Sequence, residues 1–184
     1  MAQRAPGPPV ATAAAGWQPR RMSIRPAADV DAAAIAVVHV AAWKAAYRGL
    51  MPDTVLDGLT IEARTQRWQR NFAEPLPGSR TTVLERDARV VAFASAGPSR
   101  DDPRHGELYA LYAHPDAWGT GAGRTLIVDA LAWLSAGGFP RAELWVLRGN
   151  VRAIRFYERA GFALDGGAKT SDGLDELRMS RALA

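Results

Sequence analysis

A glycine-rich turn between an apolar strand and an apolar helix constrains this chain more than any other feature. Residues 107–113 form a strand-like apolar run that ends at His114-Pro115. Glycine then recurs at positions 119, 121 and 123, and a helical pattern begins at once. Glycine permits left-handed backbone conformations and leaves the amides uncovered, and the N–H groups of a helix N-terminus attract anions. The turn therefore predicts a cradle for a phosphate or pyrophosphate.

The spacing of these glycines decides which of the known phosphate-binding motifs the turn can match. A P-loop needs glycine at position 118 and lysine at position 124, where the chain has Trp118 and Arg124. The dinucleotide pattern GxGxxG fails in both registers, because Arg124 or Leu126 occupies its last position. The pattern that fits is xxxGxG/A between a strand and a helix, with a plain glycine-rich loop as the alternative.

A second pattern, N-x-x-A-x-x-F-Y-E-x-x-G-F over residues 150–162, follows one strand later. Its apolar positions share one helix face, which predicts a core stripe that includes Phe156 and Ala160. Tyr157 lies on the same face, but a buried phenol prefers a polar partner. Asn150 is suited to cap the helix, and the cap does not exclude a ligand contact by the same side chain.

Together the two patterns resemble the GNAT superfamily of N-acetyltransferases, most specifically over residues 108–126 and 144–162. The resemblance implies an α/β fold with a mixed, mostly antiparallel central sheet, a splayed pair of parallel strands and flanking helices. It implies acetyl-CoA as co-substrate and no metal, with the pyrophosphate on the glycine turn. Family members usually carry glutamine or arginine in place of Trp118, so binding is expected to depend on main-chain N–H groups. The cofactor-binding residues implied in this way are Leu111, Tyr112, Ala113, Trp118, Gly119, Thr120, Gly121, Ala122, Gly123, Arg124, Asn150 and Tyr157.

The chemistry that the resemblance implies is direct attack of a primary amine on the thioester, through a tetrahedral intermediate. It requires a neutral amine, stabilisation of the oxyanion and protonation of the leaving thiolate. Tyr157 is the candidate acid by its likeness to the family's tyrosine, and main-chain N–H groups at 111–113 are the candidate oxyanion donors. Glu107 is the candidate base, with a solvated carboxylate and a chain of water molecules as the alternatives. The sequence contains no cysteine, which excludes an acyl-cysteine route.

The acceptor pocket is expected among aromatic residues, because the family shapes it with its first two helices. Trp43 and Tyr47 share a helix face and Tyr109 lies on the central strand, so these three are predicted to bind substrate, with core packing as the alternative for the first two. Trp68 and His39 are predicted to pack in the core. Aromatic walls with a carboxylate would suit a small cationic amine. Two alternatives stay open: a protein N-terminus, as in ribosomal-protein acetyltransferases, and an idle acetyl-CoA-binding regulatory domain.

Composition and charge limit the partners and the cellular location that are expected for the protein. The formal net charge is +4, and without Arg4, Arg20 and Arg21 of the first 21 residues it is +1, so a nucleic-acid partner is not predicted. Residues 1–21 are predicted to be a disordered basic tail before a single acetyltransferase domain over 22–184. No apolar run is long enough to cross a membrane. A cytoplasmic protein without a membrane partner is expected, and a homodimer is an open expectation because family members often form dimers.

The order of elements follows from periodicity and turn residues. Asp29 is predicted to cap the first helix, and Asp87-Ala88 is predicted to be a hairpin turn. Gly137-Gly138 is predicted to end the helix that follows the glycine turn. Further helices are expected at 61–72 and 151–160, and strands at 23–25, 81–86, 89–96, 107–113, 142–147, 162–165 and 174–181.

Overall fold

A computed structural model describes residues 22–171 and 173–183. Strands and helices follow one another in the predicted order, with one short additional helix, α2, that the sequence analysis missed. The elements are β1 (Met22–Pro26), the 3-10 turn η1 (Asp29–Asp31), α1 (Ala32–Ala46), α2 (Asp53–Asp57), α3 (Ile61–Ala73), β2 (Arg80–Arg86), β3 (Arg89–Pro98), β4 (Gly106–Ala113), the 3-10 turn η2 (Pro115–Ala117), α4 (Ala122–Ala136), β5 (Arg141–Leu147), α5 (Val151–Arg159), β6 (Ala163–Ser171) and β7 (Leu174–Ala182).

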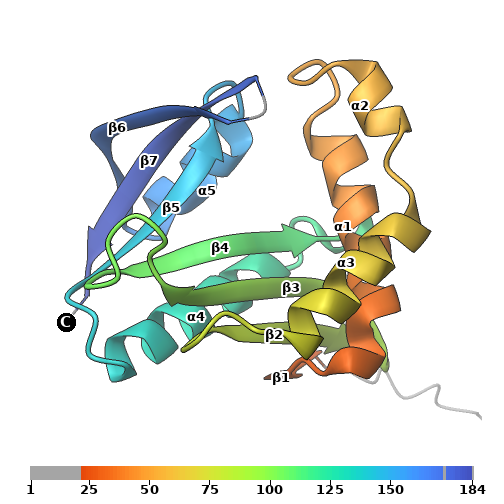
Figure 1. Cartoon of the computed structure of the whole chain (residues 1–184), viewed down its shortest axis with the longest axis horizontal. Coiled ribbons are helices and arrows are strands. Elements are labelled where there is room, and N and C mark those ends of the chain that lie inside the picture. Colours follow the sequence, from red (N-terminus) through yellow and green to blue (C-terminus); the bar gives the residue numbers. More distant parts are fainter. Residues whose placement is uncertain (1–21, 172, 184) are drawn as a thin grey trace, which may run out of the picture.

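The described strands form one sheet in the order β1-β2-β3-β4-β5-β7-β6. All neighbours are antiparallel except β4 and β5, which run parallel and pair only at Gly106–Ala142 and Glu107–Glu143. Beyond that point the two strands diverge, as Figure 1 shows. The predicted splayed parallel pair is confirmed. The hairpin turn is confirmed as well, because Asp87 and Ala88 have φ of 53° and 59°.

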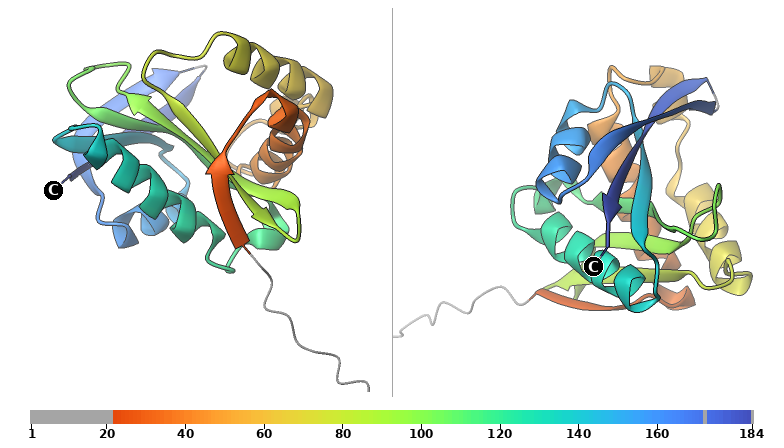
Figure 2. Two further views of the ribbon diagram at one scale, coloured as in Figure 1. Left: turned by 90° about the horizontal axis from the view of Figure 1, so that it is seen from below. Right: turned by 90° about the vertical axis from the view of Figure 1, so that its left-hand side faces the viewer.

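Helices cover both faces of the sheet. On one face α4 and α5 pack over β3, β4 and β5, around the fully buried Leu126, Leu134 and Leu144. On the other face α1 and α3 pack around Ile35 and Phe93. Figure 2 shows α4 on one side of the sheet and α1 and α3 on the other. None of the helices over residues 22–171 and 173–183 is both long and apolar enough to cross a membrane.

Three local predictions need correction or fall outside the structure. Asp29 does not cap α1, because it opens the turn η1; the buried Asp31 instead accepts a hydrogen bond from the Ala28 N–H at 2.8 Å and pairs with Arg25. The strand expected at 162–165 continues to Ser171, because an irregular step between residues 164 and 168 restores its pairing with β7. The tail over residues 1–21 lies outside the described residues.

Candidate active site

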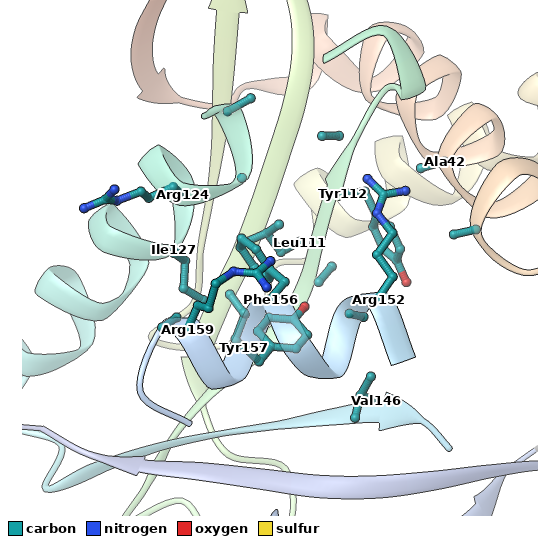
Figure 3. Close-up of a pocket in the computed structure, with 18 of the residues that line it drawn as sticks. Ala42, Leu111, Tyr112, Arg124, Ile127, Val146, Arg152, Phe156, Tyr157 and Arg159 are labelled. Atoms are coloured by element: carbon teal, nitrogen blue, oxygen red, sulfur yellow. The ribbon is translucent and has the colours of Figure 1, made fainter. Parts of the chain in front are cut away.

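The divergence of β4 and β5 opens a cavity of about 1170 Å³. β4, the glycine turn and α5 supply most of its walls, and the C-terminal part of α1 closes one end, as the close-up in Figure 3 shows. Sites for small ligands usually measure ~300–1000 Å³. The cavity is therefore large enough for a long ligand that passes between the two strands.

The glycine turn has the geometry of an anion cradle. Gly119 and Gly121 have φ of 74° and 91°, which a residue with a side chain rarely adopts. The first hydrogen bond of α4 runs from the Thr125 N–H to the Gly121 carbonyl at 2.9 Å, so the preceding N–H groups are not used inside the helix. These N–H groups and the positive end of the helix dipole favour an anion at this end of the cavity.

The side of β4 that faces β5 is an unpaired main-chain edge. Pairing of β4 with β5 stops at Glu107. On its other side β4 pairs with β3, where Ser95 pairs with Ala110 and Ala96 pairs with Leu108. Tyr109 is thus the extra residue of a β-bulge. From Leu108 to the end of β4, no described strand lies against this edge. An extended ligand in the cavity can therefore form strand-like hydrogen bonds with the β4 main chain.

Four tyrosines of the described residues line the cavity: Tyr47, Tyr109, Tyr112 and Tyr157. The hydroxyls of Tyr47 and Tyr112 lie 3.4 Å apart. Tyr157 projects from α5 into the cavity (Figure 3), and its ring packs against Phe156 and Phe162 at centroid distances of 5.1 and 6.0 Å. Burial raises the pKa of Tyr157, and the neighbouring Tyr112 raises it further. Tyr157 is therefore protonated at neutral pH.

Glu107 lies at the base of the splay and does not line the cavity. Its side chain is 1% exposed and forms an ion pair with the Arg100 guanidinium. The carboxylate also accepts a hydrogen bond from the Arg100 main-chain N–H at 3.0 Å. The alternative of a solvated carboxylate is wrong, because the loop between β3 and β4 covers this residue.

The remaining predicted residues divide into two groups. Tyr47 and Tyr109 line the cavity, as do all the predicted cofactor residues except Thr120. The Thr120 hydroxyl instead donates to the Ala117 carbonyl at 2.8 Å. Trp43 does not line the cavity either, and it packs edge-on behind Tyr47 at 5.2 Å. The predicted core role of Trp68 is confirmed, since it is buried and its Nε1–H donates to His39 Nδ1 at 3.3 Å.

The charge of the cavity differs from the expectation. No aspartate or glutamate is among the described residues that line it, so the predicted carboxylate wall is absent there. Four arginines line it instead: Arg124, Arg152, Arg159 and Arg181. The sequence alone could have placed Arg152 and Arg159 at the cavity. Residues 152, 156 and 159 have i, i+4, i+7 spacing, so both arginines share one face of α5 with Phe156. Arg181 could not be placed in this way, since only the fold brings β7 to this place.

The family model described as the acetyltransferase (GNAT) family matches residues 43–162. The chain belongs to this family. As a GNAT member it is an N-acetyltransferase and therefore an acyltransferase enzyme, and the family resemblance drawn from the sequence is confirmed.

Individual relatives agree with this assignment. The chain is 32% identical over 139 residues to the uncharacterized N-acetyltransferase YuaI of Bacillus subtilis, an alignment that covers 74% of this chain and 78% of YuaI. It is 35% identical over 85 residues to the mycothiol acetyltransferase of Acidimicrobium ferrooxidans, covering 45% of this chain and 27% of that protein. The PaiA N-acetyltransferase of Thermoplasma acidophilum, solved in complex with coenzyme A, has the same fold, with a TM-score of 0.73 and 20% identity over 88% of this chain and 99% of that one.

Proposed function

We propose that this GNAT enzyme transfers the acetyl group of acetyl-CoA to a primary amine of a small molecule. The observation that carries the proposal is the continuity of one cavity, which joins the glycine turn, the unpaired edge of β4 and the Tyr157 hydroxyl. A ligand with an anionic group at one end and an extended amide arm matches these three parts in order. The structural relative from Thermoplasma acidophilum is in complex with coenzyme A, which supports this choice of ligand.

The residues present fit such a ligand. The main-chain N–H groups from Gly119 to Arg124 would hold the pyrophosphate, except that of Thr120, which donates to the Ala117 carbonyl at 3.4 Å. The main chain of Leu111, Tyr112 and Ala113 would bind the pantetheine arm as a strand partner. Asn150 caps α5 by accepting the Ala153 N–H at 3.1 Å, and its amide NH2 group is still able to donate to the ligand. Acetyl-CoA supplies the activated acetyl group as a thioester.

Proton transfer is assigned to groups in and beside the cavity. Tyr157, whose proton is held by burial, protonates the leaving thiolate. Main-chain N–H groups of β4 at residues 111–113 would stabilise the oxyanion. The position of Glu107, ion-paired with Arg100 outside the cavity lining, favours a chain of water molecules as the route for the amine proton.

The acceptor is proposed to bind at the end of the cavity formed by Tyr47 and Tyr109. The aromatic face of Tyr47 attracts a cation, and Trp43 packs against Tyr47 in a T-shaped contact. The Arg100 guanidinium already lies over the Tyr109 ring at 5.2 Å, so Tyr109 contributes a wall rather than a cation site. The mycothiol acetyltransferase relative, named for a small molecule, supports a small acceptor. A protein N-terminus is the competing acceptor, and an idle acetyl-CoA-binding domain is the competing function.

Release of CoA thiol from acetyl-CoA, measured against a panel of amines and peptides, tests the proposal. Turnover with one class of small amine is expected; turnover only with peptides would favour a protein acceptor. Binding of acetyl-CoA without turnover on any acceptor would favour the idle domain. With an accepted amine, Tyr157→Phe is expected to lower kcat at least ~100-fold and to leave acetyl-CoA affinity unchanged. An unchanged kcat would remove Tyr157 from the mechanism.

A further inference from the structure

The Arg152 guanidinium lies on the face of the Trp118 indole, with its central carbon 3.4 Å from the ring centroid. Trp118 precedes the glycine turn on the β4 side of the splay, and Arg152 lies in the first turn of α5 on the β5 side. Both residues line the cavity. Figure 3 shows the Arg152 side chain extending away from α5. The contact therefore connects the two walls of the cavity beside the predicted anion cradle.

Trp118 is a fixed platform for this contact. Its Nε1–H donates to the Ala113 carbonyl at 2.9 Å, which ties the indole to the last residue of β4. Stacking uses the flat face of a guanidinium and leaves the N–H donors at its edge free. Arg152 is thus held in place without consuming any of its hydrogen-bond donors.

These donors have no partner in the part of the chain that the structure describes. Arg152 forms neither an ion pair nor a hydrogen bond with residues 22–171 or 173–183. Burial lowers the pKa of Arg152, because the cation is partly removed from water without an acid beside it. The cavity lining contains three further arginines and no described acid. Arg152 is exposed overall, and its pre-oriented guanidinium fork in such surroundings fits an anion with paired oxygens.

We propose that Arg152, oriented by Trp118, binds the pyrophosphate of the acyl-CoA together with the glycine turn. This inference rests on the proposed function and adds a specific side chain to it. The polar side-chain contact would come from α5, and the Trp118 indole would position it.

Calorimetric titration with three ligands tests the assignment. CoA carries a pyrophosphate and a 3′-phosphate, 3′-dephospho-CoA carries the pyrophosphate alone, and pantetheine carries neither. Arg152→Ala is expected to raise the Kd of CoA and of 3′-dephospho-CoA about tenfold, the low end for a lost charged hydrogen bond, and to leave pantetheine binding unchanged. Arg152→Lys is expected to recover only part of the loss, since an ammonium offers no planar fork.

Two further variants show whether the effect belongs to the stacked pair. Arg155→Ala removes the same side chain one turn later on α5. Both arginines are exposed, but Arg155 lies outside the cavity lining, so this variant is expected to keep the wild-type Kd. Trp118→Leu is expected to weaken CoA binding as Arg152→Ala does, and the double variant should lose little more, because both changes remove one interaction. Equal melting temperatures in all variants would exclude a folding defect.

Several results would overturn the inference. An unchanged Kd for CoA in Arg152→Ala would do so, as would an equal loss of pantetheine affinity. A loss confined to CoA and absent with 3′-dephospho-CoA would assign Arg152 to the 3′-phosphate instead. Each of these leaves the proposed function intact as long as the wild-type protein binds CoA. Failure of the wild-type protein to bind CoA would overturn both.

Discussion

The pH dependence of folding stability tests the packing around His39. This residue is 8% exposed, its ring stacks on Tyr112 at 4.9 Å, and its Nδ1 accepts the Trp68 Nε1–H at 3.3 Å. Accepting that bond requires Nδ1 to carry no proton. Burial lowers the pKa of His39 from 6.5 to about 3, and the charges of Arg64 and Arg67 add to the effect. The folded protein therefore holds His39 neutral over a pH range in which the unfolded chain protonates it.

The direction and size of the effect follow from proton linkage. A group whose pKa is lower in the folded state stabilises the fold fully above its unfolded pKa, here 6.5, and this stability is lost as the pH falls toward 3. Each pH unit inside that window costs up to about 1.4 kcal/mol. Between pH 7 and pH 5 the His39 contribution to the free energy of unfolding falls by about 2 kcal/mol. For a chain of this length that loss lowers Tm by roughly 4–8 °C.

Urea unfolding of the wild-type protein and of His39→Gln at pH 7, 6 and 5 measures this contribution. Glutamine does not titrate and can still accept a hydrogen bond from Trp68. The variant is expected to be less stable at pH 7 because of altered packing, but to lose about 2 kcal/mol less than wild type on going to pH 5. Carboxylates that titrate in this range are common to both proteins and cancel in the comparison. Parallel pH profiles would refute the assignment of a neutral, buried His39.

Two further predictions concern the point where β4 and β5 separate and the glycine turn. Glu107→Gln removes the ion pair with Arg100 and is expected to lower the free energy of unfolding by about 1–2 kcal/mol. The loss stays this small because the Arg100 side chain is 56% exposed and its charge can be solvated by water. The kcat of this variant should change less than ~3-fold, whereas a loss of ~100-fold or more in steady-state kinetics would make Glu107 the base. Gly121→Ala forces a side chain onto a φ of 91°, at a cost of about 1–2 kcal/mol, and is expected to weaken CoA binding. Gly138→Ala at the other end of α4, where φ is 81°, is the control for strain alone, and an equal loss of CoA affinity there would contradict the cradle.

Local chemistry explains how much of the fold could be predicted from the sequence. The hairpin at Asp87-Ala88 and the end of α4 at Gly137-Gly138 depend on residues that are neighbours in the chain, and both predictions were correct. The extension of β6 depends on pairing with β7 across an irregular step, which periodicity does not reveal. The short helix α2 has five residues, too few for a helical pattern to be visible.

The candidate site was predictable where one segment supplies it. The glycine turn and the face of α5 are continuous in the sequence, and nearly all the residues predicted from them line the cavity. The stacking of Arg152 on Trp118 joins two segments separated by a strand and a helix, so no sequence pattern indicates it. The absence of a described acid from the cavity lining is likewise a property of the folded arrangement.

The base of the splay shows why Glu107 could not be assigned from its position in the sequence. In the parallel register it lies directly beside Glu143, and both side chains are 1% exposed. Two carboxyl groups side by side are unfavourable unless each has a partner. The loop between β3 and β4 supplies both partners, Arg100 for Glu107 and the Ser99 hydroxyl for Glu143. The two carboxyl groups and their loop partners therefore lie at the last paired positions of β4 and β5, directly before the strands separate. Glu107 is held there by Arg100, at the base of the cavity and outside its lining, and this placement depends on a loop that the position of Glu107 in the sequence does not reveal.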